Sequence, residues 1–125
     1  MNPGEALILF GHGARDPEWA GPMRRVRELL AAQAPELRVE LAFLEFMAPT
    51  LDEAIGRLVA DGACRVTVLP MFLAQGGHLK RDLPALVDAA RACHPGTAFT
   101  LAPAVGEDDG VLAAMAAYAA NFTRP

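Results

Sequence analysis

Residues 6–17 read Ala-Leu-Ile-Leu-Phe-Gly-His-Gly-Ala-Arg-Asp-Pro, which is an apolar run followed by a glycine-flanked histidine. The apolar residues before Gly11 predict a strand buried on both faces, as in a parallel sheet. Asp16 and Pro17 form a helix-start signal, because Asp caps free N–H groups and Pro is tolerated in the first turn. His12 is therefore predicted to lie in a strand-to-helix turn, at the sheet edge where open α/β folds bind ligands.

The same arrangement occurs a second time. Residues 66–73 form an apolar run, Val-Thr-Val-Leu-Pro-Met-Phe-Leu, and residues 74–82 continue as Ala-Gln-Gly-Gly-His-Leu-Lys-Arg-Asp. Both segments read Gly-His-x-x-Arg-Asp after a predicted strand. Two glycine-preceded histidines in matching positions, His12 and His78, favour one shared site. Asp82 is interpreted as a helix N-cap.

The whole chain alternates between predicted strands and helices. Strands are predicted over residues 6–10, 38–43, 65–69 and 98–102. Helices are predicted over residues 17–34, 49–61, 79–92 and from about 109 to 121. This alternation predicts an α/β fold, a three-layer αβα sandwich around a four-stranded parallel sheet of flavodoxin-like order 2-1-3-4. At 125 residues, the chain is expected to form one domain over residues 1–125.

That strand order has a chemical consequence. The first and third strands would be neighbours, about 4.8 Å apart, so His12 and His78 would emerge side by side. Glu45, at the end of the second strand, would lie on the other side of His12. Two imidazoles and a carboxylate suit divalent Co, Ni, Fe or Zn, and three ligands leave coordination positions open. The alternative is that each histidine only makes local hydrogen bonds and that Glu45 is a solvated carboxylate.

Cationic residues accompany both histidines. Arg15, Lys80 and Arg81 lie in the turn or the first helical turn after a histidine, where they are predicted to bind carboxylates of an anionic ligand. The alternative is that Lys80 and Arg81 form a solvated helix start. The apolar residues 71–73 are interpreted either as core or as the lining for a flat hydrophobic ligand.

Composition argues against several classes of partner. The net charge of −4 argues against nucleic-acid binding. No apolar stretch approaches the roughly 18 residues that a transmembrane helix needs. Cys64 and Cys93 have neither metal-ligand nor disulfide spacing, which predicts buried or semi-buried free thiols in the cytoplasm. The sequence has no P-loop motif, so no nucleotide cofactor is expected.

Three ordered motifs, at residues 7–17, 41–51 and 68–84, resemble the CbiX/SirB sirohydrochlorin chelatases. The resemblance extends over about residues 6–105. It implies ATP-independent insertion of Co²⁺, or of Fe²⁺ or Ni²⁺, into a sirohydrochlorin-type tetrapyrrole, for cobalamin or sirohaem synthesis. The missing P-loop agrees with that expectation.

The resemblance also implies roles for single residues. His12 and His78 match the metal-binding histidines of the family, and Glu45 matches its acidic residue after the second strand. Ala14 stands where the family usually has Ser, which removes a hydroxyl but no metal ligand. The expected substrate-binding residues, which engage the carboxylates or the face of the ring, are Arg15, Gly76, Gly77, Lys80 and Arg81. Short members resemble homodimers, so a homodimer is expected here.

Two other functions fit parts of the pattern. A non-catalytic metal carrier would use the same histidines to hold and pass on an ion. A phosphoryl-transfer enzyme with a histidine nucleophile would carry an Arg-His-Gly signature. Here Gly11 precedes His12 and Arg15 follows it, which matches that signature poorly.

Overall fold

The computed structural model describes residues 4–123 and contains a four-stranded parallel sheet in the order β2-β1-β3-β4. The strands are β1 (Glu5–Gly11), β2 (Arg38–Phe43), β3 (Arg65–Pro70) and β4 (Ala98–Leu101). The helices are α1 (Gly21–Gln33), α2 (Leu51–Ala60), α3 (Gly77–Cys93) and α4 (Asp109–Ala120), with 3-10 turns η1 (Pro17–Ala20) and η2 (Val105–Glu107). The predicted fold class and strand order are confirmed.

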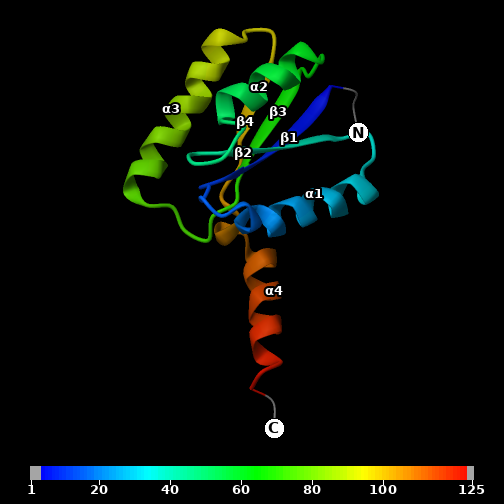
Figure 1. Cartoon of the computed structure of the whole chain (residues 1–125), viewed down its shortest axis with the longest axis vertical. Coiled ribbons are helices and arrows are strands. Elements are labelled where there is room, and N and C mark those ends of the chain that lie inside the picture. The colour runs from blue at the N-terminus through cyan, green and yellow to red at the C-terminus, as the bar shows by residue number, and fades with distance from the viewer. Residues whose placement is uncertain (1–3, 124–125) are drawn as a thin grey trace.

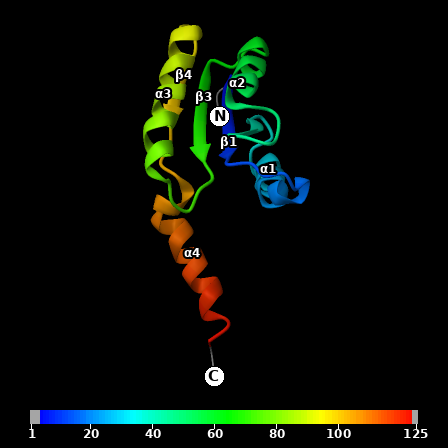
Figure 2. The ribbon, with the colours of Figure 1, turned by 60° about the vertical axis from the view of Figure 1, so that its left-hand side comes forward.

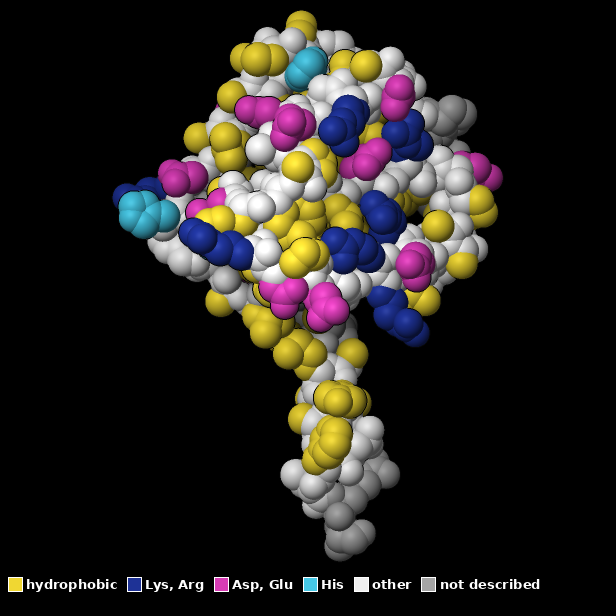
Figure 3. Space-filling model, in the orientation of Figure 1, with side chains coloured by type: hydrophobic (Ala, Val, Ile, Leu, Met, Phe, Trp, Pro, Cys, Tyr) yellow, Lys and Arg dark blue, Asp and Glu magenta, His cyan; other side chains and the backbone are white. Residues whose placement is uncertain are grey.

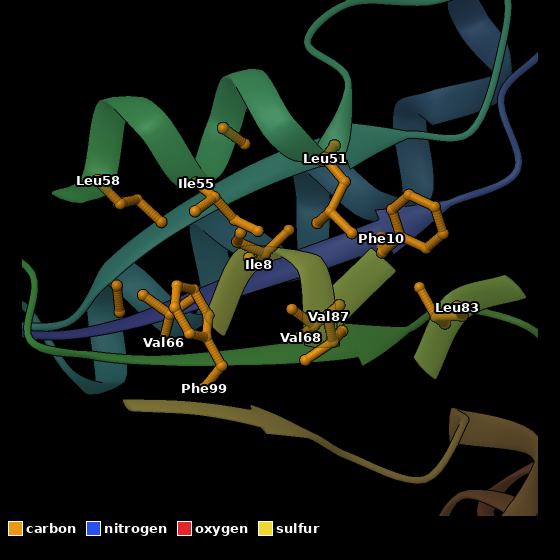
Figure 4. Packing of buried hydrophobic residues seen from close by; sticks show 14 residues of the cluster. Ile8, Phe10, Leu51, Ile55, Leu58, Val66, Val68, Leu83, Val87 and Phe99 are labelled. Carbon is orange, nitrogen blue, oxygen red and sulfur yellow. The ribbon is translucent and has the colours of Figure 1, made fainter. Parts of the chain in front are cut away.

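The sheet separates two apolar layers, because successive side chains of a strand point to opposite faces. Helices α2 and α3 cover one face and α1 covers the other (Figures 1 and 2). Ile8 and Phe10 of β1 pack beneath α2 and α3 (Figure 4). Leu9, between them in the chain, packs on the side of α1. All three are fully buried, as the apolar run predicts.

Local capping signals set where the helices begin. Asp16 accepts a hydrogen bond from the Glu18 N–H at 3.0 Å, which confirms it as an N-cap, although a 3-10 turn precedes α1. Thr50 and Glu53 form a capping box at the start of α2. The prediction for Asp82 is wrong, because Gly76 is the N-cap of α3 and Asp82 lies inside that helix.

The predicted burial of the two cysteines is also wrong. Cys64 and Cys93 are free, as expected, but both are exposed. Cys64 directly precedes β3 and Cys93 is the last residue of α3, so each lies at the end of an element rather than within the sheet core. Among residues 4–123, no helix is both long and apolar enough to cross a membrane.

Helix α4 stands apart from the layers. It leaves the carboxyl end of the sheet through η2 and extends away from it as a rod (Figures 1 and 2). None of its residues is buried. Among the residues that the structure describes, the face of the sheet that carries α1 is therefore covered by a helix only beside β2 and β1.

Candidate active site

His12 and Glu45 meet at the carboxyl edge of β1 and β2. The His12 Nε2 and Glu45 Oε1 atoms are 3.0 Å apart, and each side chain is about half exposed. The backbone continues the strand pairing past the strands, since the Leu44 N–H donates to the Gly11 carbonyl and the Glu45 N–H donates to the His12 carbonyl. The parallel register of neighbouring strands thus places the imidazole beside the carboxylate.

Gly13 makes this close approach possible. Its φ is 94°, in the left-handed region that favours glycine. A Cβ atom at this position would overlap the carbonyl oxygen of Glu45. The sequence showed a glycine on each side of His12, but only the structure explains why the second one is required.

The hydrogen bond fixes how His12 is presented. An ionised carboxylate only accepts hydrogen bonds, so His12 donates its Nε2–H to Glu45. If a divalent ion lay about 2.1 Å from both Nε2 and Oε1, with a right angle between the two bonds, these two atoms would be about 3 Å apart. The pair can therefore exchange its shared proton for a metal ion.

An aromatic residue and a cation border the pair. The Arg15 guanidinium lies 4.9 Å from the centre of the Phe46 ring. Phe46 is exposed and has a φ of 67°. This cation–π contact links the loop after β1 to the loop after β2. Sequence reasoning selected Arg15 but missed Phe46, whose only signal was its place beside Glu45.

The second histidine is not part of this pair. His78 lies exposed on the first turn of α3, beyond the loop of residues 71–76. Within residues 4–123, no three His, Cys, Asp or Glu side chains come close enough to hold a metal ion. The prediction that His12, His78 and Glu45 lie together is thus confirmed for His12 and Glu45. It is wrong for His78 in this structure.

The loop of residues 71–76 is held by η2. The Gly106 N–H donates to the Phe72 carbonyl at 3.0 Å, and a Cβ on Gly106 would overlap the Leu73 carbonyl. The Phe72 ring packs edge-on against Phe10, with centroids 6.0 Å apart. Leu73, in contrast, is 63% exposed. In this apolar loop, Phe72 therefore belongs to the core and Leu73 is exposed. The hydrogen bond from Gly106 that holds the loop was not predicted from the sequence.

The start of α3 is cationic and open. Lys80 and Arg81 are exposed among its first five residues, close in the chain to His78. The N-cap Gly76 supplies no side-chain hydrogen bond to the first N–H groups of the helix. Free N–H groups, the positive end of the helix dipole and two cations together favour a bound carboxylate.

Comparison with known proteins gives one matching family. The CbiX family model matches residues 6–121. A sirohydrochlorin cobaltochelatase of Methanococcus aeolicus is 37% identical over 83 residues, which cover 66% of this chain and 58% of that relative. A sirohydrochlorin cobaltochelatase of Saccharolobus islandicus is 41% identical over 81 residues, covering 65% of this chain and 62% of the relative. The chain thus spans less than two thirds of the length of these relatives.

Solved structures of CbiX and SirB proteins are also similar to this chain. A CbiX protein from Marinobacter aquaeolei superposes with a TM-score of 0.82 at 28% identity, covering 95% of this chain and 97% of that one. The sirohydrochlorin chelatase SirB from Bacillus subtilis subspecies spizizenii, in complex with cobalt, superposes with a TM-score of 0.72 at 26% identity. That match covers 84% of this chain and 45% of SirB.

Proposed function

The chain belongs to the CbiX family, and from that membership we propose that it inserts a divalent metal ion, Co²⁺ first among them, into sirohydrochlorin without a nucleotide. Relatives named cobaltochelatases and the cobalt complex of SirB support cobalt as the metal. Fe²⁺ and Ni²⁺ are the other candidate metals, since imidazole and carboxylate ligands accept all three.

The hydrogen-bonded pair of His12 and Glu45 is the observation that carries this proposal. Metal insertion must release two pyrrole N–H protons as the ion enters the ring. When the ion moves from the protein into the ring, the lone pairs of His12 and Glu45 that would have bound it become free. The pair can then accept one of these protons. Because both side chains are about half exposed, the second proton can leave to water. Charge balances, as one divalent ion replaces two protons.

We propose that His78 is the second metal-binding histidine. It lies at the start of α3, which follows β3, the neighbour of β1 in the sheet. To share an ion with His12, the first turn of α3 must approach the edge of β1. Residues 73, 74, 76 and 77 are exposed, which supports a movement of the chain between the Phe72 anchor on η2 and the start of α3.

The substrate is proposed to lie across the same edge. Its carboxylates would meet Arg15 on one side, and Lys80, Arg81 and the N–H groups following Gly76 on the other. Gly77, the first residue of α3, has no side chain to block this approach. The exposed Phe46 and Leu73 side chains offer apolar area to the face of the macrocycle.

We propose that residues 1–125 act as one domain, that the protein works in the cytoplasm and that it acts as a homodimer. The two free cysteines are consistent with a reducing compartment.

The decisive experiment is anaerobic absorbance spectroscopy of sirohydrochlorin with Co²⁺, Fe²⁺ or Ni²⁺, with catalytic amounts of protein or without it. A protein-dependent spectral change identifies a chelatase, and the relative rates rank the metals. The His12→Ala variant is the control for metal carried over with the protein. Tight cobalt binding without any acceleration over the spontaneous reaction would contradict the proposal and assign a metal carrier instead.

A further inference from the structure

Phe46 has a backbone conformation that its residue type does not favour. Its φ of 67° lies in the left-handed region, which glycine adopts freely and which strains a bulky side chain. Burial does not offset this strain, because Phe46 is 58% exposed, whereas its neighbours Phe43 and Met47 pack in the core on the side of α1. Strained residues cluster at functional sites. Neither the backbone nor the core therefore explains a phenylalanine at this position.

The Phe46 ring contacts a cation. The Arg15 guanidinium lies over the ring, 4.9 Å from its centre. Arg15 is exposed, and its guanidinium makes no hydrogen bond or salt bridge with any of residues 4–123. A guanidinium that lies over a ring keeps its N–H groups at its own edge. Arg15 can therefore bind a carboxylate through two hydrogen bonds without leaving the ring.

The two loops that supply this contact also carry the candidate active site. Arg15 follows His12 by three residues, and Phe46 directly follows Glu45. The loops are joined by the hydrogen bond from the Glu45 N–H to the His12 carbonyl and by the close approach of Gly13 to Glu45. The ring thus holds the guanidinium at the border of the His12–Glu45 pair.

General electrostatic attraction does not replace such placement. The chain has a net charge of −4, and cationic and acidic side chains are interspersed on the face drawn in Figure 3. An anionic ligand is therefore attracted by single cations at fixed positions. A free arginine side chain loses rotamer freedom when it binds a ligand, and one that an aromatic ring already holds loses less.

We propose that Phe46 is a positioning residue for substrate binding, whose ring holds the Arg15 guanidinium where it meets a carboxylate of the macrocycle. This inference rests on the proposed function, because it takes a sirohydrochlorin-type tetrapyrrole as the ligand. The ring acts through Arg15, so its loss weakens substrate binding and leaves the chemical step and the stability of the fold intact.

Steady-state insertion kinetics with sirohydrochlorin and Co²⁺ test this role. Phe46→Leu keeps an apolar side chain but removes the ring face, so we expect KM to rise about three- to fivefold, with kcat changed by less than about twofold. Phe46→Tyr keeps the ring and should keep KM at the value of the unmodified protein. Leu29→Ala, which removes an exposed apolar side chain of α1, is the control and should leave KM unchanged.

A double variant shows whether the ring acts through Arg15. In an Arg15→Ala background, Phe46→Leu should raise KM by less than about twofold, because the guanidinium that the ring holds is gone. A rise as large as in the unmodified background would mean that the ring acts on the macrocycle itself, and it would overturn the proposal. An unchanged KM for Phe46→Leu alone overturns it as well.

Thermal unfolding separates positioning from structural support. Phe46→Gly relieves the left-handed strain, so we expect a Tm equal to or above that of the unmodified protein, together with the raised KM of Phe46→Leu. A lower Tm with a parallel loss of kcat would mean that the ring only supports the two loops, which contradicts a positioning role.

Absorbance titration with metal-free sirohydrochlorin measures binding without insertion. The variants should change the Kd by the same factors as the KM. If the Kd values follow this pattern and no metal is inserted, the proposed function fails and the role of Phe46 stands. If metal is inserted and neither KM nor Kd responds to Phe46→Leu, the role of Phe46 fails and the proposed function stands. A protein that does not bind sirohydrochlorin contradicts both.

Discussion

Gly13 lies so close to Glu45 that a Cβ atom on Gly13 would overlap the Glu45 carbonyl oxygen. The backbone that carries the imidazole and the backbone that carries the carboxylate are therefore in direct contact. The hydrogen bond between His12 and Glu45 depends on this contact, since both residues are held by the same pair of loops.

Gly13→Ala should separate the pair without disrupting the fold. The new methyl group must displace residues 44–46, and alanine at a φ of 94° costs about 1–2 kcal/mol of strain. We expect metal insertion to fall at least about tenfold. Gly56→Ala is the matched control, because it lies in α2 with open space around it. It should leave insertion unchanged and stabilise the helix by up to about 1 kcal/mol.

Glu45→Gln should lower the rate of insertion while the protein stays folded. Glutamine keeps the size and can still bond to His12, but it cannot take up a pyrrole proton. Loss of a general base costs about 10²–10⁴-fold in rate. Because both side chains are about half exposed, we expect His12→Ala and Glu45→Gln each to change the free energy of unfolding by about 0.5 kcal/mol or less. A Glu45→Gln rate within twofold of the unmodified protein would rule out the proton-acceptor role.

His78→Ala tests whether the separated histidine is a ligand. If α3 brings His78 to the metal, the variant should lose insertion and bind Co²⁺ more weakly in calorimetric titrations. His94→Ala is the control, because His94 is the C-cap residue of α3, at the opposite end of that helix. Full insertion activity in His78→Ala would restrict the metal site to His12 and Glu45.

Arg81→Ala should act on substrate binding rather than on the chemical step. Arg81 is exposed near the start of α3, so its removal takes away attraction for a carboxylate but no reacting group. We expect a higher KM, a nearly unchanged kcat and a weaker dependence of KM on salt concentration. Arg25→Ala, on the exposed surface of α1, should leave KM unchanged. An unchanged KM for Arg81→Ala would remove the residue from the substrate site.

Most of the fold could be predicted because it follows from local patterns. The boundaries of β2, residues 38–43, were predicted correctly from apolar periodicity. The meeting of His12 and Glu45 followed from strand order, since neighbouring parallel strands end at the same edge. These features depend on residues that are close in sequence or on a topological rule.

The features that sequence reasoning missed depend on contacts between distant segments. The fit of Gly13 against Glu45 and the anchoring of Leu73 by Gly106 involve loops that are far apart in the chain. The start of α3 was predicted at residue 79, two residues late, because a glycine N-cap such as Gly76 gives a weak sequence signal. The extension of α4 away from the sheet could not be predicted either. Its apolar pattern indicates a covered helix but does not identify the surface that covers it.

The capping box of α2 should make stability depend on pH. The Thr50 N–H donates to the Glu53 carboxylate and holds the pKa of that carboxyl below its usual value of 4.5. A lowered folded-state pKa stabilises the protein above the unfolded-state pKa, and this stabilisation is lost as the pH falls through the folded-state value. Urea unfolding at pH 7 should therefore show Glu53→Gln to be less stable than the unmodified protein, and the difference should shrink toward pH 3. Asp52→Asn, at the exposed neighbouring position, is the control. A difference that stays constant from pH 7 to pH 3 would mean that the carboxylate charge does not stabilise the start of α2.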